Sequence, residues 1–266
     1  LALRNVVLRG ADGVPLARLS ELGGTMALRP LLHGEVQPGT IRLSGLQLNL
    51  RRERAGSIGV MVRETAPAGP GTEDGPGRNA ALGVHTLIAQ IDTALQSPAL
   101  SALTSIQADN LTLRYEDARA GRAWNVDGGQ ATLTRLGDDL RIRGDFFLLG
   151  ERSYATSLEI SFASRIGLDS AEIGVNFEDA PAGELALQSP ALAWLGALDA
   201  PISGALRVGM DNTGALGPLN ATLQIGKGVL QPTEATKPIE FDSARSYFTY
   251  DPKAQTIQFE SLSVDS

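Results

Sequence analysis

The chain has 266 residues, of which 42% are hydrophobic and 20% charged, a composition typical of a folded protein. The formal net charge is −7, with Arg and acidic residues interspersed, so there is no evident basic face for nucleic acid or anionic lipid headgroups. Because there are no cysteines, disulfides, zinc ribbons and thiol chemistry are excluded, and cytoplasm and periplasm both stay open.

The first 63 residues predict an N-terminal β unit. Strict alternation of apolar and polar residues predicts strands at Leu1–Leu8, Thr25–Leu28, Thr40–Leu50 and Ser57–Val62. Between them, Arg29–Glu35 contains a Pro that stops a strand and a Gly that permits a reversal, and we expect Leu31 and Leu32 there to close one end of the sheet. Because a strand pattern starts at Leu1, which is not Met, we expect a fragment of a longer protein.

Residues 64–83 form a predicted flexible linker, since the stretch APAGPGTEDGPGRNAA cannot bury enough apolar surface to offset the entropy of ordering. A helix is expected at 84–97, ending near Ser97-Pro98. Its apolar stripe follows helical spacing and consists of Val84, Leu87, Ile88, Ile91 and Leu95.

The predicted third region, 84–266, returns to strands after this helix. The strands expected here are Ile106–Tyr115, Gly129–Leu136, Leu140–Leu149, Ser153–Phe162, Ala171–Phe177, Ala205–Met210, Asn220–Ile225, Gly228–Gln231, Ile239–Phe241, Arg245–Tyr250 and Thr256–Val264. A second helix near 189–199 is indicated by the cap residue and proline Ser189-Pro190 and by the stop at Pro201.

One pattern, apolar-x-apolar-x-x-apolar-x-apolar, occurs four times. Its apolar positions are Leu1, Leu3, Val6 and Leu8; Ile41, Leu43, Leu46 and Leu48; Ile106, Ala108, Leu111 and Leu113; and Ile257, Phe259, Leu262 and Val264. The extra residue in the middle would turn the second half to the other face unless the strand bulges there. The middle pairs are Arg4-Asn5, Ser44-Gly45, Asp109-Asn110 and Glu260-Ser261. We therefore expect a mainly β fold: a strongly twisted antiparallel sheet, curled into an elongated groove or partial barrel, with two short amphipathic helices.

Catalytic and metal-binding signatures are missing from the sequence. The only histidines, His33 and His85, are far apart in the chain, and surface imidazoles explain them better than a metal site. The acidic pairs Asp138-Asp139 and Glu73-Asp74 lack EF-hand spacing and fall where turns need polar residues. No hydrolase elbow, phosphate loop or zinc-protease motif occurs. We expect that the protein is not an enzyme and binds no metal or cofactor.

The apolar face has two open interpretations. It either fills the core of a packed β domain or lines a groove for acyl chains, because each buried methylene contributes about 0.8 kcal/mol. The candidate groove residues are Leu43, Leu46, Leu48, Leu111, Leu113, Leu158, Ile160, Phe162, Phe259, Leu262 and Val264.

Several segments in the N-terminal half resemble the N-terminal region of AsmA-like proteins: Pro15–Leu19, Leu28–Glu35 and Ile41–Leu48, in this order. The second half resembles the central region of the YhdP branch of that superfamily. The matching segments are Asp199–Gly204, Pro238–Phe241, Tyr250-Asp251 and Ile257–Val264.

This resemblance implies a periplasmic protein of a Gram-negative envelope, tethered to the inner membrane by a segment that this sequence lacks. It further implies a repeating β groove that conducts phospholipid acyl chains toward the outer membrane, possible contacts with other envelope proteins, and no nucleic-acid partner. The alternatives are a non-transporting envelope scaffold with a packed core, which binds partners at its strand edges, and a carbohydrate-active β protein.

Overall fold

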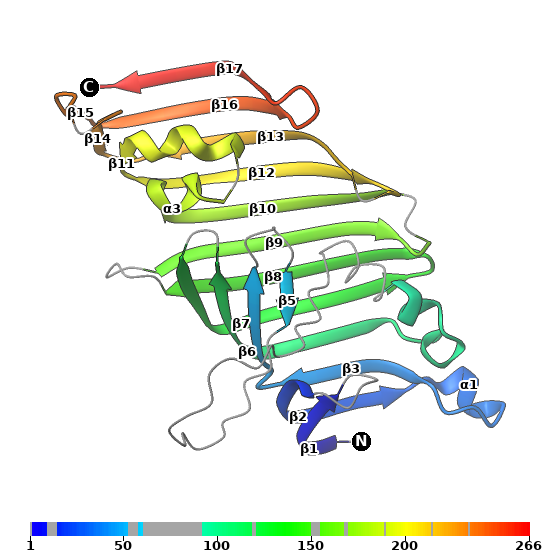
Figure 1. Cartoon of the computed structure of the whole chain (residues 1–266). Helices are drawn as coiled ribbons and strands as arrows, with labels where there is room; N and C mark the ends of the chain where they lie inside the picture. Colours follow the sequence, from blue (N-terminus) through cyan, green and yellow to red (C-terminus); the bar gives the residue numbers. More distant parts are fainter. Residues whose placement is uncertain are drawn as a thin grey trace. The chain divides into compact units, whose positions relative to one another are not determined.

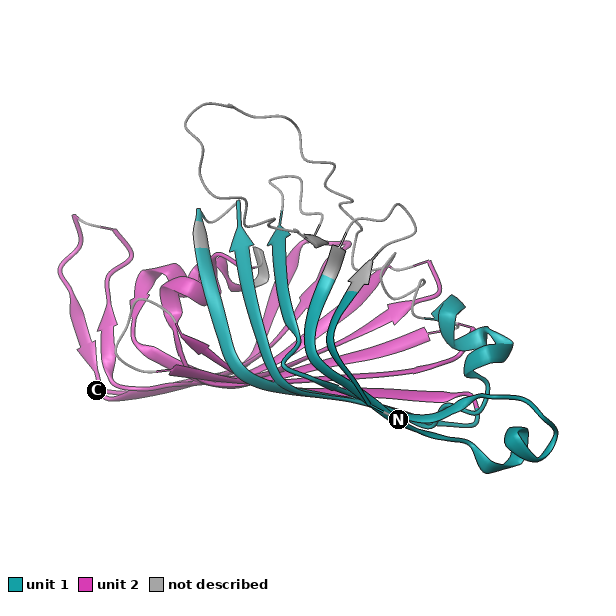
Figure 2. Ribbon diagram, turned by 90° about the horizontal axis from the view of Figure 1, so that it is seen from below, with its two compact units in different colours: residues 1–137 teal, residues 138–266 magenta. Residues whose placement is uncertain are grey.

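The computed structural model describes residues 2–9, 15–52, 58–60, 92–118, 121–149, 155–167, 170–188, 190–213, 215–233 and 235–266. The fold is mainly β, as the sequence predicts (Figure 1). The chain divides into two compact units, Leu1–Gly137 and Asp138–Ser266, coloured separately in Figure 2. This division falls inside the region 84–266 that the sequence groups together, and the expected linker 64–83 lies outside the described residues.

Unit 1 is built on one branched sheet. Its strands are β1 (Ala2–Arg9), β2 (Pro15–Met26), β3 (Pro38–Ser44), β4 (Gln47–Arg52), β5 (Ile58–Val60), β6 (Ser105–Asp117) and β7 (Arg122–Leu136). Along one half of β6 the order is β7-β6-β3-β2-β1, and along the other half β6 pairs with β4, which pairs with β5. The predicted strand Thr40–Leu50 is therefore two strands. The predicted strand Thr25–Leu28 is wrong in its second half, because β2 ends at Met26 and Leu28 begins the helix α1 (Leu28–Leu32).

The sheet of unit 1 is mixed, whereas the sequence predicts an antiparallel one. β6 runs parallel to both β3 and β4, with Ile41 opposite Ile106 and Leu48 opposite Leu113. Parallel neighbours need a long connection, and the chain has one between Arg52 and Ser105. Because β6 completes the sheet of β3 and β4, the predicted unit 1–63 shares its sheet with residues beyond position 100.

The predicted irregularities in the repeats are present. The backbone angle φ is positive at Asn5, Gly45 and Asn110, the second residue of the middle pair in three copies. In the fourth copy the register between β16 and β17 shifts, so that Tyr247 lies opposite Ser261 and Phe248 opposite Phe259, which leaves Glu260 as the extra residue. Asn and Gly tolerate the left-handed conformation better than other residues, which explains their positions here.

Unit 2 has a seven-stranded antiparallel sheet in the order β8-β9-β10-β12-β13-β16-β17. These strands are β8 (Asp139–Leu149), β9 (Ala155–Arg165), β10 (Ser170–Pro181), β12 (Pro201–Asp211), β13 (Leu216–Ile225), β16 (Ser243–Asp251) and β17 (Thr256–Asp265). A small second sheet contains β11 (Leu198–Asp199), β14 (Gly228–Leu230) and β15 (Ile239–Phe241).

Two short helices pack on one face of the unit 2 sheet (Figure 1). They are α3 (Ala182–Ala186) and the 3₁₀ helix η2 (Pro190–Ala197), which replaces the amphipathic α-helix expected at 189–199. Leu195, Ile202 and Leu223 are completely buried between these helices and the sheet. The C-terminal half of the chain thus has a solid core.

Unit 1 also contains short helices. Residues 92–96, the described end of the helix expected at 84–97, are helical, and η1 (Pro98–Leu100) follows them. The helix α1 (Leu28–Leu32) occupies the predicted turn, with Pro30 in its first turn, where a missing N–H breaks no helical hydrogen bond. The expectation that Leu31 and Leu32 close one end of the sheet is wrong, because they are 48% and 85% exposed.

Candidate functional site

The unit 2 sheet has one apolar and one polar face. Residues directly opposite each other on neighbouring strands share a face, so the pairings define rows that cross the sheet. One row crosses all seven strands and is apolar throughout. We call it the apolar strip; its residues are Ile142, Phe162, Ile173, Val208, Leu219, Tyr250 and Ile257.

Each residue of the apolar strip is half-buried. Six strand spacings of about 4.8 Å give the strip a length of about 29 Å. The hydrocarbon of one membrane leaflet is about 15 Å thick, half of the bilayer core. The strip is therefore longer than one leaflet is thick, and an extended acyl chain fits along it.

The next row is apolar as well, and η2 packs on part of it. It contains Gly144, Ile160, Val175, Leu206, Ala221, Phe248 and Phe259. Trp194 of η2 meets Phe248 and Phe259 edge-on, with ring centroids 6.0 and 5.6 Å apart. These aromatic contacts hold η2 beside the apolar strip. Among the strip residues, only Ile257 packs against the described residues of this core.

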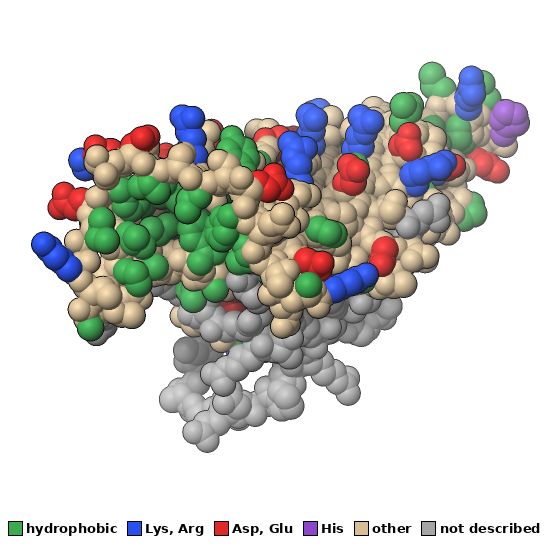
Figure 3. All heavy atoms as spheres, turned by 90° about the horizontal axis from the view of Figure 1, so that it is seen from above, with side chains coloured by type: hydrophobic (Ala, Val, Ile, Leu, Met, Phe, Trp, Pro, Cys, Tyr) green, Lys and Arg blue, Asp and Glu red, His purple; other side chains and the backbone are tan. Residues whose placement is uncertain are grey.

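Among the described strands of the seven-stranded unit 2 sheet, β17 carries the most exposed apolar side chains. Phe259 is 46% exposed, and Leu262 and Val264 are both 58% exposed. In Figure 3, hydrophobic side chains gather toward these C-terminal strands. An edge strand with several exposed apolar side chains is a common feature of interaction surfaces.

The structure brings six of the eleven candidate residues to one face of unit 2. Leu158, Ile160 and Phe162 of β9 lie in three successive rows of that face, and Phe162 belongs to the apolar strip. On β17 at the edge, Phe259 lies in the row of Ile160 and Leu262 in the row of Leu158, and Val264 lies one row further on.

The other five candidates lie together on one face of unit 1. Leu46 and Leu111 are 9% and 6% exposed, so ordinary core packing explains them. Leu43, Leu48 and Leu113 are half-buried beside them, and Leu113 lies opposite the buried Val126. Five of the candidates therefore lie in unit 1 and six in unit 2.

Sequence reasoning missed Ile142, Ile173, Val208, Leu219 and Tyr250. Alternation predicts the strands that contain Ile142, Ile173, Val208 and Tyr250. Leu219 lies one residue before the predicted strand Asn220–Ile225, in the longer β13 of the structure. The row that joins them depends on the pairing register, which alternation in a single strand does not contain. The strip could therefore not be predicted from the residue types of any one strand, because it depends on how distant strands pair.

The opposite face of unit 2 is polar and carries two shallow hollows. One, of about 140 Å³, is lined by residues that include Arg207, Asn220 and Glu260, and Thr249 bonds both Asn220 and Glu260 at 3.1 and 3.2 Å. The other, of about 270 Å³, is lined by residues that include Asp179, Ser203 and Arg245. Both hollows lie on the face away from the apolar strip.

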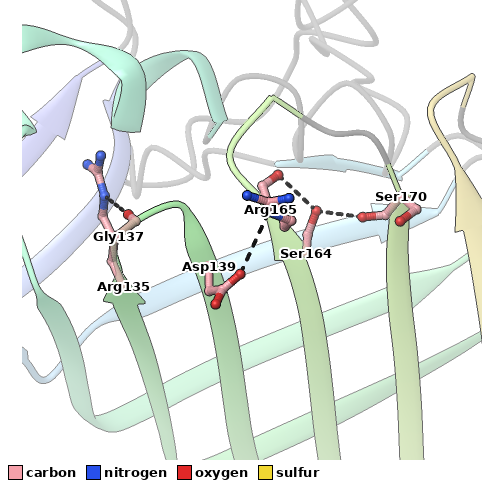
Figure 4. A network of polar contacts seen from close by, with 6 residues as sticks. All are labelled: Arg135, Gly137, Asp139, Ser164, Arg165 and Ser170. Atoms are coloured by element: carbon pink, nitrogen blue, oxygen red, sulfur yellow. Dashed lines mark hydrogen bonds and ion pairs between the residues drawn. The ribbon is translucent and has the colours of Figure 1, made fainter.

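The turns at one end of the unit 2 strands are also polar. Arg165 faces Asp139 at 3.8 Å, with both side chains more than 60% exposed, and Ser164 donates to the carbonyl of Ser170 at 2.8 Å (Figure 4). In unit 1, Arg135 donates to the Gly137 carbonyl at 3.0 Å. Exposed pairs of this kind contribute little to stability and suggest no catalytic arrangement.

Unit 1 exposes a second apolar surface around α1, which we call the α1 tip. Its most exposed members, Leu28, Leu32 and Val36, are 77%, 85% and 70% exposed, and Met26 is 44% exposed. Arg29 and His33 lie within the same turn, where His33 Nδ1 is 2.9 Å from the Arg29 carbonyl. An apolar loop with basic residues of this kind suits the interface of a membrane.

No described group of three His, Asp or Glu side chains could hold a metal ion. Among the described helices, none has both the length and the apolar character needed to cross a membrane. Comparisons with protein-family models, curated proteins and solved structures found no match to this chain.

Proposed function

We propose that unit 2 holds phospholipid acyl chains along the apolar strip, as part of a periplasmic protein that moves lipid between the inner and outer membranes. The carrying observation is the apolar row through seven strands, half-buried on every strand, next to a core that η2 already completes. Because η2 and α3 already form a buried core with the neighbouring rows, the unit does not need the strip to complete that core. The resemblance to AsmA-like proteins is the basis for the envelope setting.

The energetics favour a hydrocarbon ligand. Covering the exposed part of a half-buried row removes apolar area from water at about 25 cal/mol per Å². The side chains of the strip include a single polar group, the Tyr250 hydroxyl. The strip can therefore bind an acyl chain whatever headgroup the lipid carries. Ligand identity would then be set mainly by chain length.

Native mass spectrometry tests this proposal after incubation with vesicles of phosphatidylethanolamine and phosphatidylglycerol. Val208→Asp adds a carboxylate in the middle of the strip and should abolish lipid retention, because an acyl chain there would desolvate the charge. Asn220→Asp is the matched control, since Asn220 is exposed on the polar face of the neighbouring strand and already accepts a hydrogen bond from Thr249. It should keep lipid bound.

A second variant guards against unfolding by Val208→Asp. Val208→Thr keeps the shape of the side chain, and a hydroxyl at a half-buried position has access to water. It should reduce bound lipid several-fold while circular dichroism and the melting temperature stay near wild type. Undiminished lipid in both folded variants contradicts the proposed strip.

The α1 tip supplies a place where unit 1 could meet a lipid surface. Leu28→Ser and Leu32→Ser together should reduce co-flotation with the same vesicles without changing the fold, because both side chains are already in water. Unchanged flotation of this double variant argues against the α1 tip as the contact.

A packed envelope scaffold is the second candidate, and the buried core under η2 and α3 favours it. In that case purified protein is free of lipid, vesicles add none, and Val208→Asp acts only on stability. The same mass spectra therefore separate the two functions.

A further inference from the structure

Two of the four repeats pair directly with each other. β3 and β4 carry the second copy and β6 carries the third, in parallel register, with Leu43 opposite Ala108 and Leu48 opposite Leu113. The Gly45 N–H donates to the Asp109 carbonyl at 3.0 Å, and the Thr112 N–H donates to the Leu46 carbonyl at 2.9 Å. The irregular residues of both copies thus lie side by side, and hydrogen bonds continue through them.

The first and fourth copies are β1 and β17, and both are edge strands. Among the described strands, β1 pairs only with β2, and β17 pairs only with β16. Both expose apolar side chains: Leu3 is 51% and Leu262 is 58% exposed. Neither strand contains Pro or Lys, two residues that often protect sheet edges.

The charges of these two strands are complementary in the register of the paired repeats. Superimposing the repeats sets Leu3 beside Phe259 and Val6 beside Leu262. The same register sets Arg4 beside Glu260. The Arg4 side chain is 83% exposed, and the Glu21 carboxylate lies 3.9 Å from its guanidinium, so Arg4 can reach a second carboxylate.

We propose that β17 of one copy of this chain pairs in parallel with β1 of a second copy, in the register that β3, β4 and β6 display. The contact joins two different surfaces, so it repeats from copy to copy and extends the sheet. Main-chain hydrogen bonds supply affinity, and the Arg4–Glu260 pair selects the register. This proposal does not depend on lipid binding.

Sedimentation velocity over a range of concentrations tests the assembly. The wild-type chain should form a concentration-dependent series of oligomers. Arg4→Glu places two carboxylates side by side and Glu260→Arg two guanidinium groups, so each variant alone should associate about tenfold more weakly. An equimolar mixture of the two variants restores opposite charges at every contact and should regain wild-type association.

The Arg4→Glu variant also identifies the pairing strands. A symmetric β17–β17 contact would leave association unchanged in Arg4→Glu and so overturns the proposal, as does a wild-type chain that stays monomeric at high concentration. Arg143→Glu on β8 and Glu172→Arg on β10, both at exposed positions of unit 2, are the matched charge controls. Equal weakening by these controls would trace the effect to net charge and would also overturn it.

Discussion

Gly45 donates its backbone N–H to the carbonyl of Asp109 at 3.0 Å, next to the left-handed Asn110. This bond joins two copies of one repeat at their irregular residues. Ser20 of β2 lies on the other side of Gly45, so close that a Cβ on Gly45 would collide with the Ser20 hydroxyl. The close approach of β2 and β6 at this point therefore requires a residue without a side chain at position 45.

Gly45→Ala should lower the free energy of unfolding by about 2 kcal/mol, because the left-handed conformation and the collision with Ser20 both oppose a methyl group. Gly121→Ala is the control for backbone conformation alone: its φ is +63° and its Cβ would meet nothing within 4 Å. We expect about 1 kcal/mol there. Urea denaturation measures both.

Adding Ser20→Gly to Gly45→Ala separates the two causes. The double variant removes the colliding atoms and should recover much of the difference between Gly45→Ala and Gly121→Ala. If Gly45→Ala is no worse than Gly121→Ala, the close approach of β2 is not a source of strain.

The irregular residues could be predicted from the sequence because their cause is local. A two-residue gap in an alternating pattern, filled by Asn or Gly, predicts a change in the backbone whatever the partner strand is. Asn5, Gly45 and Asn110 all have positive φ for this reason. The same local logic locates most strands.

The long-range features could not be predicted in this way. Parallel pairing of β6 with β3 and β4 depends on which strands meet, and the apolar strip depends on register across seven strands. β2 was largely missed, since its Gly23-Gly24 pair gives weak strand propensity that its pairing with β1 and β3 overcomes. The α1 tip was missed because exposed leucines resemble core residues in a sequence.

Ser246 is a buried hydroxyl in the core of unit 2. It is completely buried on the apolar face, between Leu223 and Leu262, and its Oγ has no hydrogen-bond partner within the described part of the chain. Ser246→Ala should therefore raise the free energy of unfolding by about 1 kcal/mol, because desolvating an unpaired hydroxyl is unfavourable.

Ser243→Ala, in the same strand, is the matched control. Its hydroxyl donates to Asp265 at 3.1 Å, so its loss should be neutral or slightly destabilising. Thermal and urea denaturation of both variants are the measurements. Destabilisation by Ser246→Ala would instead indicate that a bound water or ligand satisfies the hydroxyl.

Asp117 forms an ion pair with Arg52 that joins β6 to β4. The two side chains are 0% and 17% exposed, and the Arg52 guanidinium lies 3.4 Å from the Asp117 carboxylate. Arg52→Met keeps the length of the side chain but removes the charge, and should lower the free energy of unfolding by about 3 kcal/mol at neutral pH.

Asp117→Asn in the Arg52→Met background provides the test of cause. Removing the buried charge as well should recover part of the lost stability, since a neutral amide is less costly to bury. An Arg52→Met variant as stable as wild type would mean that the other interactions of Asp117 suffice.

Tyr115 stacks on Trp124 with ring centroids 5.7 Å apart, close to the same ion pair. Burial raises the pKa of its phenol, and the Asp117 charge raises it further, while the charge of Arg52 and its hydrogen bond oppose the shift. Because the folded pKa exceeds the unfolded value of about 10, the contribution of this group to stability is complete below pH 10 and is lost as the pH rises above it.

Tyr115→Phe removes this titration, so the variant should lose less stability than wild type between about pH 9 and pH 11. Urea denaturation at steps of about half a pH unit measures the free energy of unfolding of both proteins. At pH 8 the two should differ only by the hydrogen bond with Arg52, because both rings are then neutral. Parallel curves for wild type and Tyr115→Phe would place the Tyr115 phenol in water rather than against Trp124.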